Sequence, residues 1–146
     1  MSSFKGWRRL RPTSTILIIL VGCLTSCTQK PITVSDLAAS LRSLHSYAAE
    51  TALFIDYVEA GKATMQYAHA HLIYVAEEVK DANAKINTHA ESGLDLPLAE
   101  CREQYKLLAQ QLERLSKHLD DPLTLADVKQ QVQHIQEVSD RTRRGL

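Results

Sequence analysis

The chain has 146 residues, enough for one domain, and its 45% hydrophobic content with only five glycines and four prolines favours helices over a sheet sandwich. Basic and acidic residues balance at 17 each. However, residues 1–26 hold four basic side chains and no acid, so the remainder carries a net charge of −4. This acidic body argues against nucleic acid as a partner, because phosphates attract a basic surface.

Residues 1–26 have the three parts of a secretory signal. The basic head MSSFKGWRRLRPTST is followed by the apolar run ILIILVGCL and then by small residues. That apolar run covers residues 16–24, whereas a membrane-spanning helix needs about 20 apolar residues. The pattern therefore predicts an export signal that is cleaved rather than a permanent membrane span.

The sequence LTSC, at residues 24–27, resembles the lipobox of bacterial lipoproteins, in which an aliphatic residue and two small ones precede a cysteine. The resemblance is confined to the N-terminal end of the chain. It implies cleavage before Cys27, diacylglycerol on the Cys27 thiol and acylation of the new N-terminus. LVGC, which ends at Cys23, fits the same pattern but leaves a shorter apolar run, so we prefer Cys27. The alternative is an ordinary cleaved signal whose cysteines are incidental.

The resemblance also implies a location. In lipoproteins of two-membrane bacteria an aspartate after the cysteine favours the inner membrane, whereas Thr28 stands here, which implies the periplasmic face of the outer membrane. Several acyl chains make such an anchor nearly permanent, because each buried methylene contributes about 0.8 kcal/mol. We therefore expect a signal peptide at residues 1–26, a lipidated N-terminus and linker at 27–32, and a helical bundle domain at 33–146.

Four segments after Pro31 carry apolar residues at alternating steps of three and four, which is the pattern of packed helices. The sequence predicts an all-α fold, an up-down bundle of four helices that buries all four apolar stripes without a partner. The apolar stripes run from Leu37 to Val58, from Met65 to Ile86, from Leu98 to Leu119 and from Leu125 to Val138.

Helix ends are indicated by local signals. ITVSDL and LTLADV each place an aspartate three residues after a threonine, which predicts caps at Thr33 and Thr124, and Pro97 suits the first turn of the third helix. Gly61 and Thr64 suit a break between the first two helices. An unbroken step of seven through this region leaves an alternative fold, one long helix through Gly61 with a shorter helical pair packed on it.

The sequence contains no glycine-rich phosphate loop, no CxxC pair and no Glu-x-x-His spacing of a di-iron bundle. His69 and His71 would point about 200° apart on a helix, so they cannot share an ion. Cys101 falls in an apolar stripe and is interpreted as a small hydrophobic residue. We therefore expect no enzyme, no metal and no cofactor.

The candidate ligand groove is a stripe of polar and aromatic residues on the second helix. The first helix has a comparable flank, and facing rows of this kind would line a groove for a ligand or a peptide. The alternative is that tyrosines simply border the core, with hydroxyls that reach water. The stripe consists of Tyr67, His71, Tyr74 and Glu78, and the facing flank of Tyr47, Glu50, Phe54 and Tyr57.

These features together predict a membrane-anchored envelope lipoprotein whose non-enzymatic helical domain binds a protein partner or associates with itself. The alternative function is a small-molecule or metal-binding helical bundle in the periplasm, which would use the stripe on the second helix. An enzyme is the third hypothesis and ranks last, because no spacing in the sequence suggests an acid, a base and a nucleophile that meet in one site.

Overall fold

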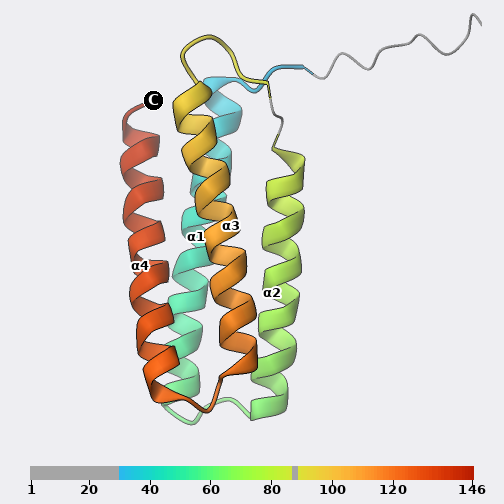
Figure 1. The fold of residues 1–146 in the computed structure, drawn as a ribbon, viewed down its shortest axis with the longest axis vertical. Coiled ribbons are helices and arrows are strands. Elements are labelled where there is room, and N and C mark those ends of the chain that lie inside the picture. The colour runs from blue at the N-terminus through green and yellow to red at the C-terminus, as the bar shows by residue number, and fades with distance from the viewer. Residues whose placement is uncertain (1–29, 87–88) are drawn as a thin grey trace, which may run out of the picture.

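The computed structural model of the protein describes residues 30–86 and 89–146, and the candidate lipidation cysteines Cys23 and Cys27 lie outside these ranges. The described residues form four helices that run alternately up and down, with no strand among them (Figure 1). The prediction of an all-α bundle of four helices is confirmed. The helices are α1 (Val34–Glu59), α2 (Met65–Lys85), α3 (Asp95–Lys117) and α4 (Pro122–Arg144).

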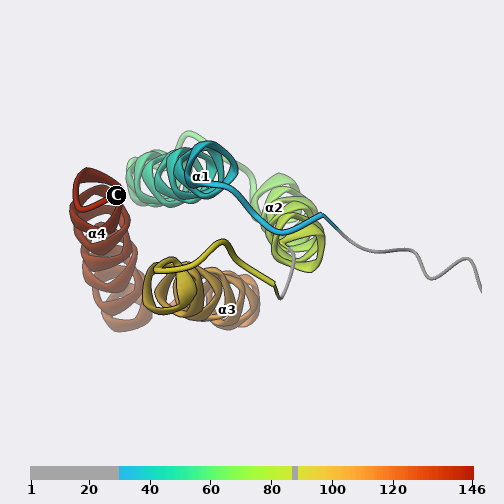
Figure 2. The ribbon, with the colours of Figure 1, turned by 90° about the horizontal axis from the view of Figure 1, so that it is seen from above.

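Seen along the bundle, the helices form a ring in chain order (Figure 2). The packing around this ring is uneven, since α1 lies mainly along α4 and α2 mainly along α3, while α1 and α2 touch only slightly. The start of α1 and the C-terminus of the chain lie at the same end (Figure 1). Within the described residues, none of the helices combines the length and the apolar character needed to cross a membrane.

The core is made by the apolar stripes that the sequence predicts. Leu37, Leu41, Leu108 and Val132 are among the fully buried side chains. The one wrong assignment is Met65, which is exposed because it stands at the first position of α2, beyond the last turn of the core. The other members of the four stripes are buried, except for Val58 and Ala82, which are half-buried.

The turn at Gly61 separates α1 from α2, so the alternative of one long helix is wrong. Gly61 has φ +66°, a left-handed conformation that ends a helix and that glycine adopts without a steric penalty. The amide of Gly61 donates to the Val58 carbonyl at 2.9 Å, and the Lys62 amide donates to the Tyr57 carbonyl at 3.1 Å. The Thr64 hydroxyl then accepts from the Tyr67 amide and caps α2, as predicted.

The predicted capping box at the start of α1 is confirmed. The Thr33 hydroxyl accepts from the Asp36 amide at 3.2 Å, and the Asp36 carboxylate accepts from the Thr33 amide at 3.1 Å. The Thr33 hydroxyl also donates to the Asp36 carboxylate at 2.7 Å. This bond, and after it the bond from the Thr33 amide, holds the pKa of Asp36 below its usual value, because both favour the ionised form.

The predicted cap of α4 at Thr124 is wrong. Asp121 is the capping residue, and its carboxylate accepts from the amides of Leu123 and Thr124, both at 3.2 Å. Pro122 explains the earlier start, since proline lacks an N–H and its fixed φ suits the first helical position. Thr124 therefore lies inside the first turn, where its hydroxyl donates to Asp121.

An isolated parallel β-bridge joins the segment before α1 to the connection between α2 and α3. The Ile32 amide donates to the His89 carbonyl at 2.8 Å, and the Glu91 amide donates to the Ile32 carbonyl at 3.1 Å. The Ile32 side chain is buried in the core. The packed part of the chain thus includes Ile32, the last residue of the expected linker, which fixes the point where the chain enters the bundle.

Candidate functional site

Aromatic rings from α1 and α2 meet across the slight contact between these helices. The rings of Phe54 and His71 lie 4.3 Å apart, and those of Phe54 and Tyr67 lie 6.2 Å apart. Tyr67 and His71 stack on α2 at 5.9 Å with their planes within 16°. Tyr57 adds a fourth ring, 6.5 Å from Phe54. We call this cluster of Phe54, Tyr57, Tyr67 and His71 the aromatic seam.

The hairpin at Gly61 explains why these residues meet. Phe54 stands seven residues before Gly61 and Tyr67 six residues after it, so antiparallel packing brings them to the same level. Tyr67 and His71 are four residues apart and therefore share one face of α2. Phe54 of the row on α1 therefore contacts Tyr67 and His71 of the row on α2.

A polar contact extends the aromatic seam on the side of His71. Its Nε2 atom lies 3.6 Å from Glu50 Oε1 across the two helices. The His71 side chain is largely covered, whereas Glu50 is about half exposed. Because a neutral imidazole carries no charge, this contact is an ion pair only when His71 is protonated.

Farther along the bundle, Tyr74 and Glu78 of α2 approach Tyr47 of α1. Partial burial raises the pKa of the Tyr47 hydroxyl, and the nearby Glu78 carboxylate, Tyr74 and Glu50 add to that rise. The four residues of the expected stripe on α2 therefore all lie along α1. Because the two rows pack against each other, what remains open is a pair of shallow depressions beside the aromatic seam, of about 570 and 410 Å³. Ligand binding in this groove remains a prediction.

The outer surface beside the aromatic seam is apolar and open to solvent. Leu53 of α1 is 70% exposed, and Tyr67 and Tyr74 of α2 are 55% and 62% exposed. Tyr57 is also exposed. We call Leu53, Tyr57, Tyr67 and Tyr74 the exposed strip. Leu53 does not belong to the predicted groove, although an apolar residue that breaks the three-and-four spacing of its helix is a visible signal in the sequence.

The two histidines of the HAH sequence contact different helices. The Nδ1 atom of His69 lies 2.9 Å from the Ser116 carbonyl oxygen of α3, whereas His71 packs on Phe54 of α1. The expectation that they point apart is thus confirmed. A group of three or more histidine, cysteine, aspartate or glutamate side chains placed to hold a metal ion does not occur in residues 30–86 or 89–146.

Cys101 is buried in the core, as its place in the apolar stripe of α3 predicts. It is a free thiol with no exposed surface. Burial raises its pKa to about 12, because the thiolate would lose its hydration. The thiol is therefore protonated and shielded at neutral pH, which is the environment of a structural cysteine.

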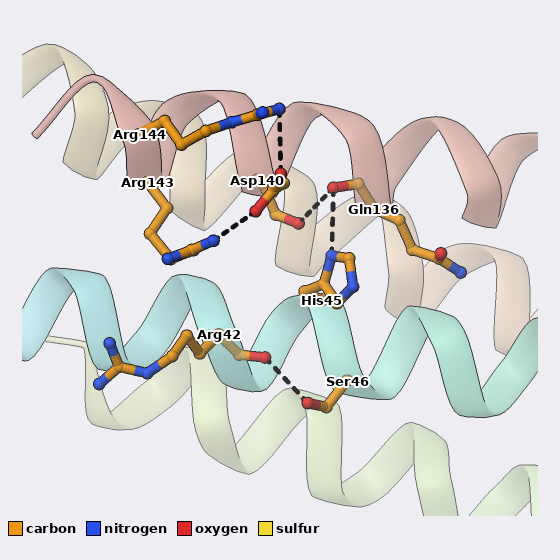
Figure 3. A network of polar contacts seen from close by, with 8 residues as sticks. Arg42, His45, Ser46, Gln136, Asp140, Arg143 and Arg144 are labelled. Atoms are coloured by element: carbon orange, nitrogen blue, oxygen red, sulfur yellow. Dashed lines mark hydrogen bonds and ion pairs between the residues drawn. The ribbon is translucent and has the colours of Figure 1, made fainter.

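The C-terminal turn of α4 carries a local ion-pair network (Figure 3). Asp140 accepts from Arg143 at 2.6 Å and pairs with Arg144 at 3.0 Å. The hydrogen bond from Arg143 chiefly holds the pKa of Asp140 below its usual value. His45 of α1 reaches the Gln136 carbonyl of α4 at 3.4 Å, which links the two helices at this level. Arg143 and Arg144 stand in the last turn of α4, where positive charge complements the helix dipole.

A further depression, of about 780 Å³, lies between α2 and α3. Its charged residues lie outside the apolar stripes of both helices, so the spacing in the sequence does not indicate this depression. Comparison of the chain with family models, with curated proteins and with solved structures gave no match.

Proposed function

We propose that the chain is a lipid-anchored protein of the bacterial envelope whose helical domain binds another protein through the exposed strip. The observation that carries this proposal is the position of Leu53, Tyr67 and Tyr74, three large side chains more than half exposed on one face of α1 and α2. Exposed apolar side chains gathered on one surface are typical of protein interfaces, and tyrosine is enriched there.

The structure beneath the exposed strip supports a contact surface. Phe54 and His71 lie under Tyr67 and hold its ring through stacked and tilted contacts. A ring that is already positioned loses little conformational freedom on binding, so more of its burial contributes to affinity. The contact between α1 and α2 that the strip overlies is also the slightest between chain neighbours in the bundle.

Charges beside the strip indicate the chemistry of the partner. Glu50 of α1 and Glu78 of α2 lie on the flanks where these two helices meet, and both are exposed. A partner with an apolar ridge bordered by lysine or arginine would match this surface in both shape and sign. A second copy of the chain would instead bring these acids together, so we favour a different protein.

The anchor part of the proposal is supported by the resemblance of LTSC, at residues 24–27, to a lipobox and by the point where the chain enters the bundle. Ile32 is fixed in the core, and five residues of chain span at most about 18 Å, so a lipid on Cys27 would hold one end of the bundle close to the membrane. Leu53 is 19 residues along α1 from Val34, or about 28 Å at 1.5 Å per residue. The exposed strip would therefore stand away from the membrane.

Crosslinking from membranes tests the interface. Tyr67→Ala combined with Tyr74→Ala should reduce capture of the specific partner at least tenfold, whereas Ile73→Ala should leave it unchanged. Ile73 is a matched control because it is 46% exposed on the same helix but faces away from α1. Equal capture by all three proteins would overturn the proposal. Stoichiometric zinc or iron that is lost in His71→Ala would favour the alternative, a metal-binding bundle.

Mass spectrometry of the mature N-terminus tests the anchor independently. The expected product begins at Cys27 and carries a diacylglyceryl group, and it should disappear in Cys27→Ser but persist in Cys23→Ser. A mature chain that starts at an unmodified Thr28, or at Met1, would refute lipidation at Cys27.

A further inference from the structure

The depression between α2 and α3 is lined by cations, in a molecule whose body is acidic. Its charged lining includes a single acid, Glu113. Two of the cations, Lys85 and Arg102, have no ion-pair partner among residues 30–86 and 89–146. We call this depression the basic groove, and its cations are Lys30, Lys80, Lys85, Arg102 and Lys106.

Helical register explains the gathering of charge. Arg102 and Lys106 are four residues apart and share one face of α3. Lys80 of α2 stands opposite and lines the groove together with Glu113 of α3. The hydrogen bond with Glu77 chiefly raises the pKa of Lys80, and the charge of Glu113 adds to that rise. Lys30 comes from the segment that the β-bridge at Ile32 holds against this end of the bundle.

The remaining ion pairs of the basic groove are weak and exchangeable. Lys80 pairs with Glu77 at 3.0 Å and Lys106 with Glu103 at 3.6 Å, each within one helix and with both side chains about half exposed or more. Such surface pairs contribute about 0–1 kcal/mol. An oxyanion that contacts several cations at once can therefore displace them at little cost.

The floor of the basic groove adds two further requirements for a ligand. Ile86, Tyr105 and Ala109 form an apolar base, so the ligand needs an apolar part beside its charge. Asn83 also lines the groove, and its Oδ1 atom is buried without a hydrogen-bond partner in the described residues. Rotation of the Asn83 side chain toward the groove would let this oxygen accept from a ligand hydroxyl, which would remove the cost of leaving it unpaired.

We propose that the basic groove binds the phosphate and adjoining hydroxyl of an anionic lipid headgroup. Its volume of about 780 Å³ is within the roughly 300–1,000 Å³ typical of ligand sites. Lys30 follows Cys27 by three residues, which span at most about 11 Å, so an anchor at Cys27 would keep the groove within reach of the headgroup layer. The choice of a lipid rests on the proposed anchor, whereas the anion site itself does not.

Binding is measured on the mature full-length protein purified in nonionic detergent micelles. Phosphatidylglycerol is titrated into the micelles, phosphatidylcholine serves as the uncharged comparison, and inorganic phosphate and glycerol 3-phosphate are titrated separately. We expect saturable binding of phosphatidylglycerol. The double variant Arg102→Gln/Lys106→Gln should weaken it at least tenfold, and Glu113→Gln should tighten it about threefold, since one nearby negative charge is removed.

The matched control is Arg42→Gln/Lys62→Gln, which removes the same charge from exposed positions outside the basic groove. It should bind like the unchanged protein. Binding of glycerol 3-phosphate as tight as that of the lipid would keep the anion site and assign it a free phosphate ester as ligand. No saturable binding of any phosphate, or equal weakening in both double variants, would overturn the proposal. Neither result depends on the partner of the exposed strip or on the mass of the N-terminus.

Discussion

Tyr105 connects three parts of the molecule through one side chain. Its ring is buried in the core and also forms part of the floor of the basic groove. Its hydroxyl donates to the Ser40 carbonyl of α1 at 2.9 Å and thereby joins α3 to α1 across the bundle. Burial raises the pKa of this hydroxyl, because the phenolate would lose its hydration, so it acts as a neutral donor.

Removal of this hydroxyl tests the link between α3 and α1. We expect Tyr105→Phe to lower the free energy of unfolding by about 1 kcal/mol, the usual contribution of one partly buried hydrogen bond. The control is Tyr57→Phe, whose hydroxyl belongs to an exposed ring and whose loss should change stability little. Urea denaturation followed by circular dichroism measures both, and equal stabilities of the two variants would contradict the assignment.

At the scale of the helix, the sequence was more informative about the interior of an element than about its ends. The alternation of threes and fours predicted the buried faces because one rule governs every turn. Each end, by contrast, depends on competition among a few residues. Asp121 and Thr124 are both good caps, and the decision falls to Pro122, whose fixed φ starts α4 one residue after Asp121.

The cap of α4 should make stability depend on pH. Hydrogen bonds from Thr124 and Leu123 hold the pKa of Asp121 below its usual value of 3.8. The stabilisation from the ionised carboxylate is therefore complete above about pH 3.8 and is lost as the pH falls through the lowered pKa. Asp121→Asn keeps a capping oxygen but cannot ionise.

We expect the unchanged protein to be more stable than Asp121→Asn at pH 6, and the difference to shrink as the pH falls toward 2. Urea midpoints measured at several pH values give this difference directly. Asp120→Asn, a neighbouring carboxyl outside the cap, is the control and should show a smaller change with pH. A difference that stays constant over the whole range would mean that Asp121 does not cap as a carboxylate.

The turn at Gly61 gives a second test at this scale. A Cβ atom at this position would meet nothing within 4 Å, so any cost of Gly61→Ala comes from the positive φ of +66° rather than from crowding. We expect a loss of about 1 kcal/mol, the lower part of the range for a left-handed residue with a side chain. Gly145→Ala, where φ is −88°, should be nearly neutral in the same thermal-unfolding measurement.

At the scale of the whole molecule, the apolar core was predictable and the charged groove was not. The spacing of apolar residues alone predicts that Leu37 and Leu108 are buried. The basic groove joins Lys80 of one helix to Arg102 of another, and only the folded ring of helices decides that α2 lies beside α3. The aromatic seam stands between these cases, because the row on each helix is visible in the sequence while their contact requires the turn at Gly61.

The uneven packing of the bundle bears on whether its four helices unfold together. If α1 with α4 and α2 with α3 behaved as separate pairs, the slight contact between α1 and α2 would open first. Against this, α3 also packs on α4 and on α1, and the buried side chains of all four helices form one cluster. A single core predicts that all four helices unfold in one transition.

Leu108→Ala measures that cooperativity, since Leu108 is fully buried in α3. We expect a loss of about 2–5 kcal/mol, as for other buried leucines, and Leu123→Ala is the control because Leu123 is 80% exposed. With one core, far-ultraviolet ellipticity and the near-ultraviolet tyrosine signal should fall at the same urea concentration, and both midpoints should shift together in Leu108→Ala. If the tyrosine signal fell at a lower urea concentration than the far-ultraviolet ellipticity, the aromatic seam would open before the helices unfold. The side chains of the exposed strip would then not be held in fixed positions before a partner binds.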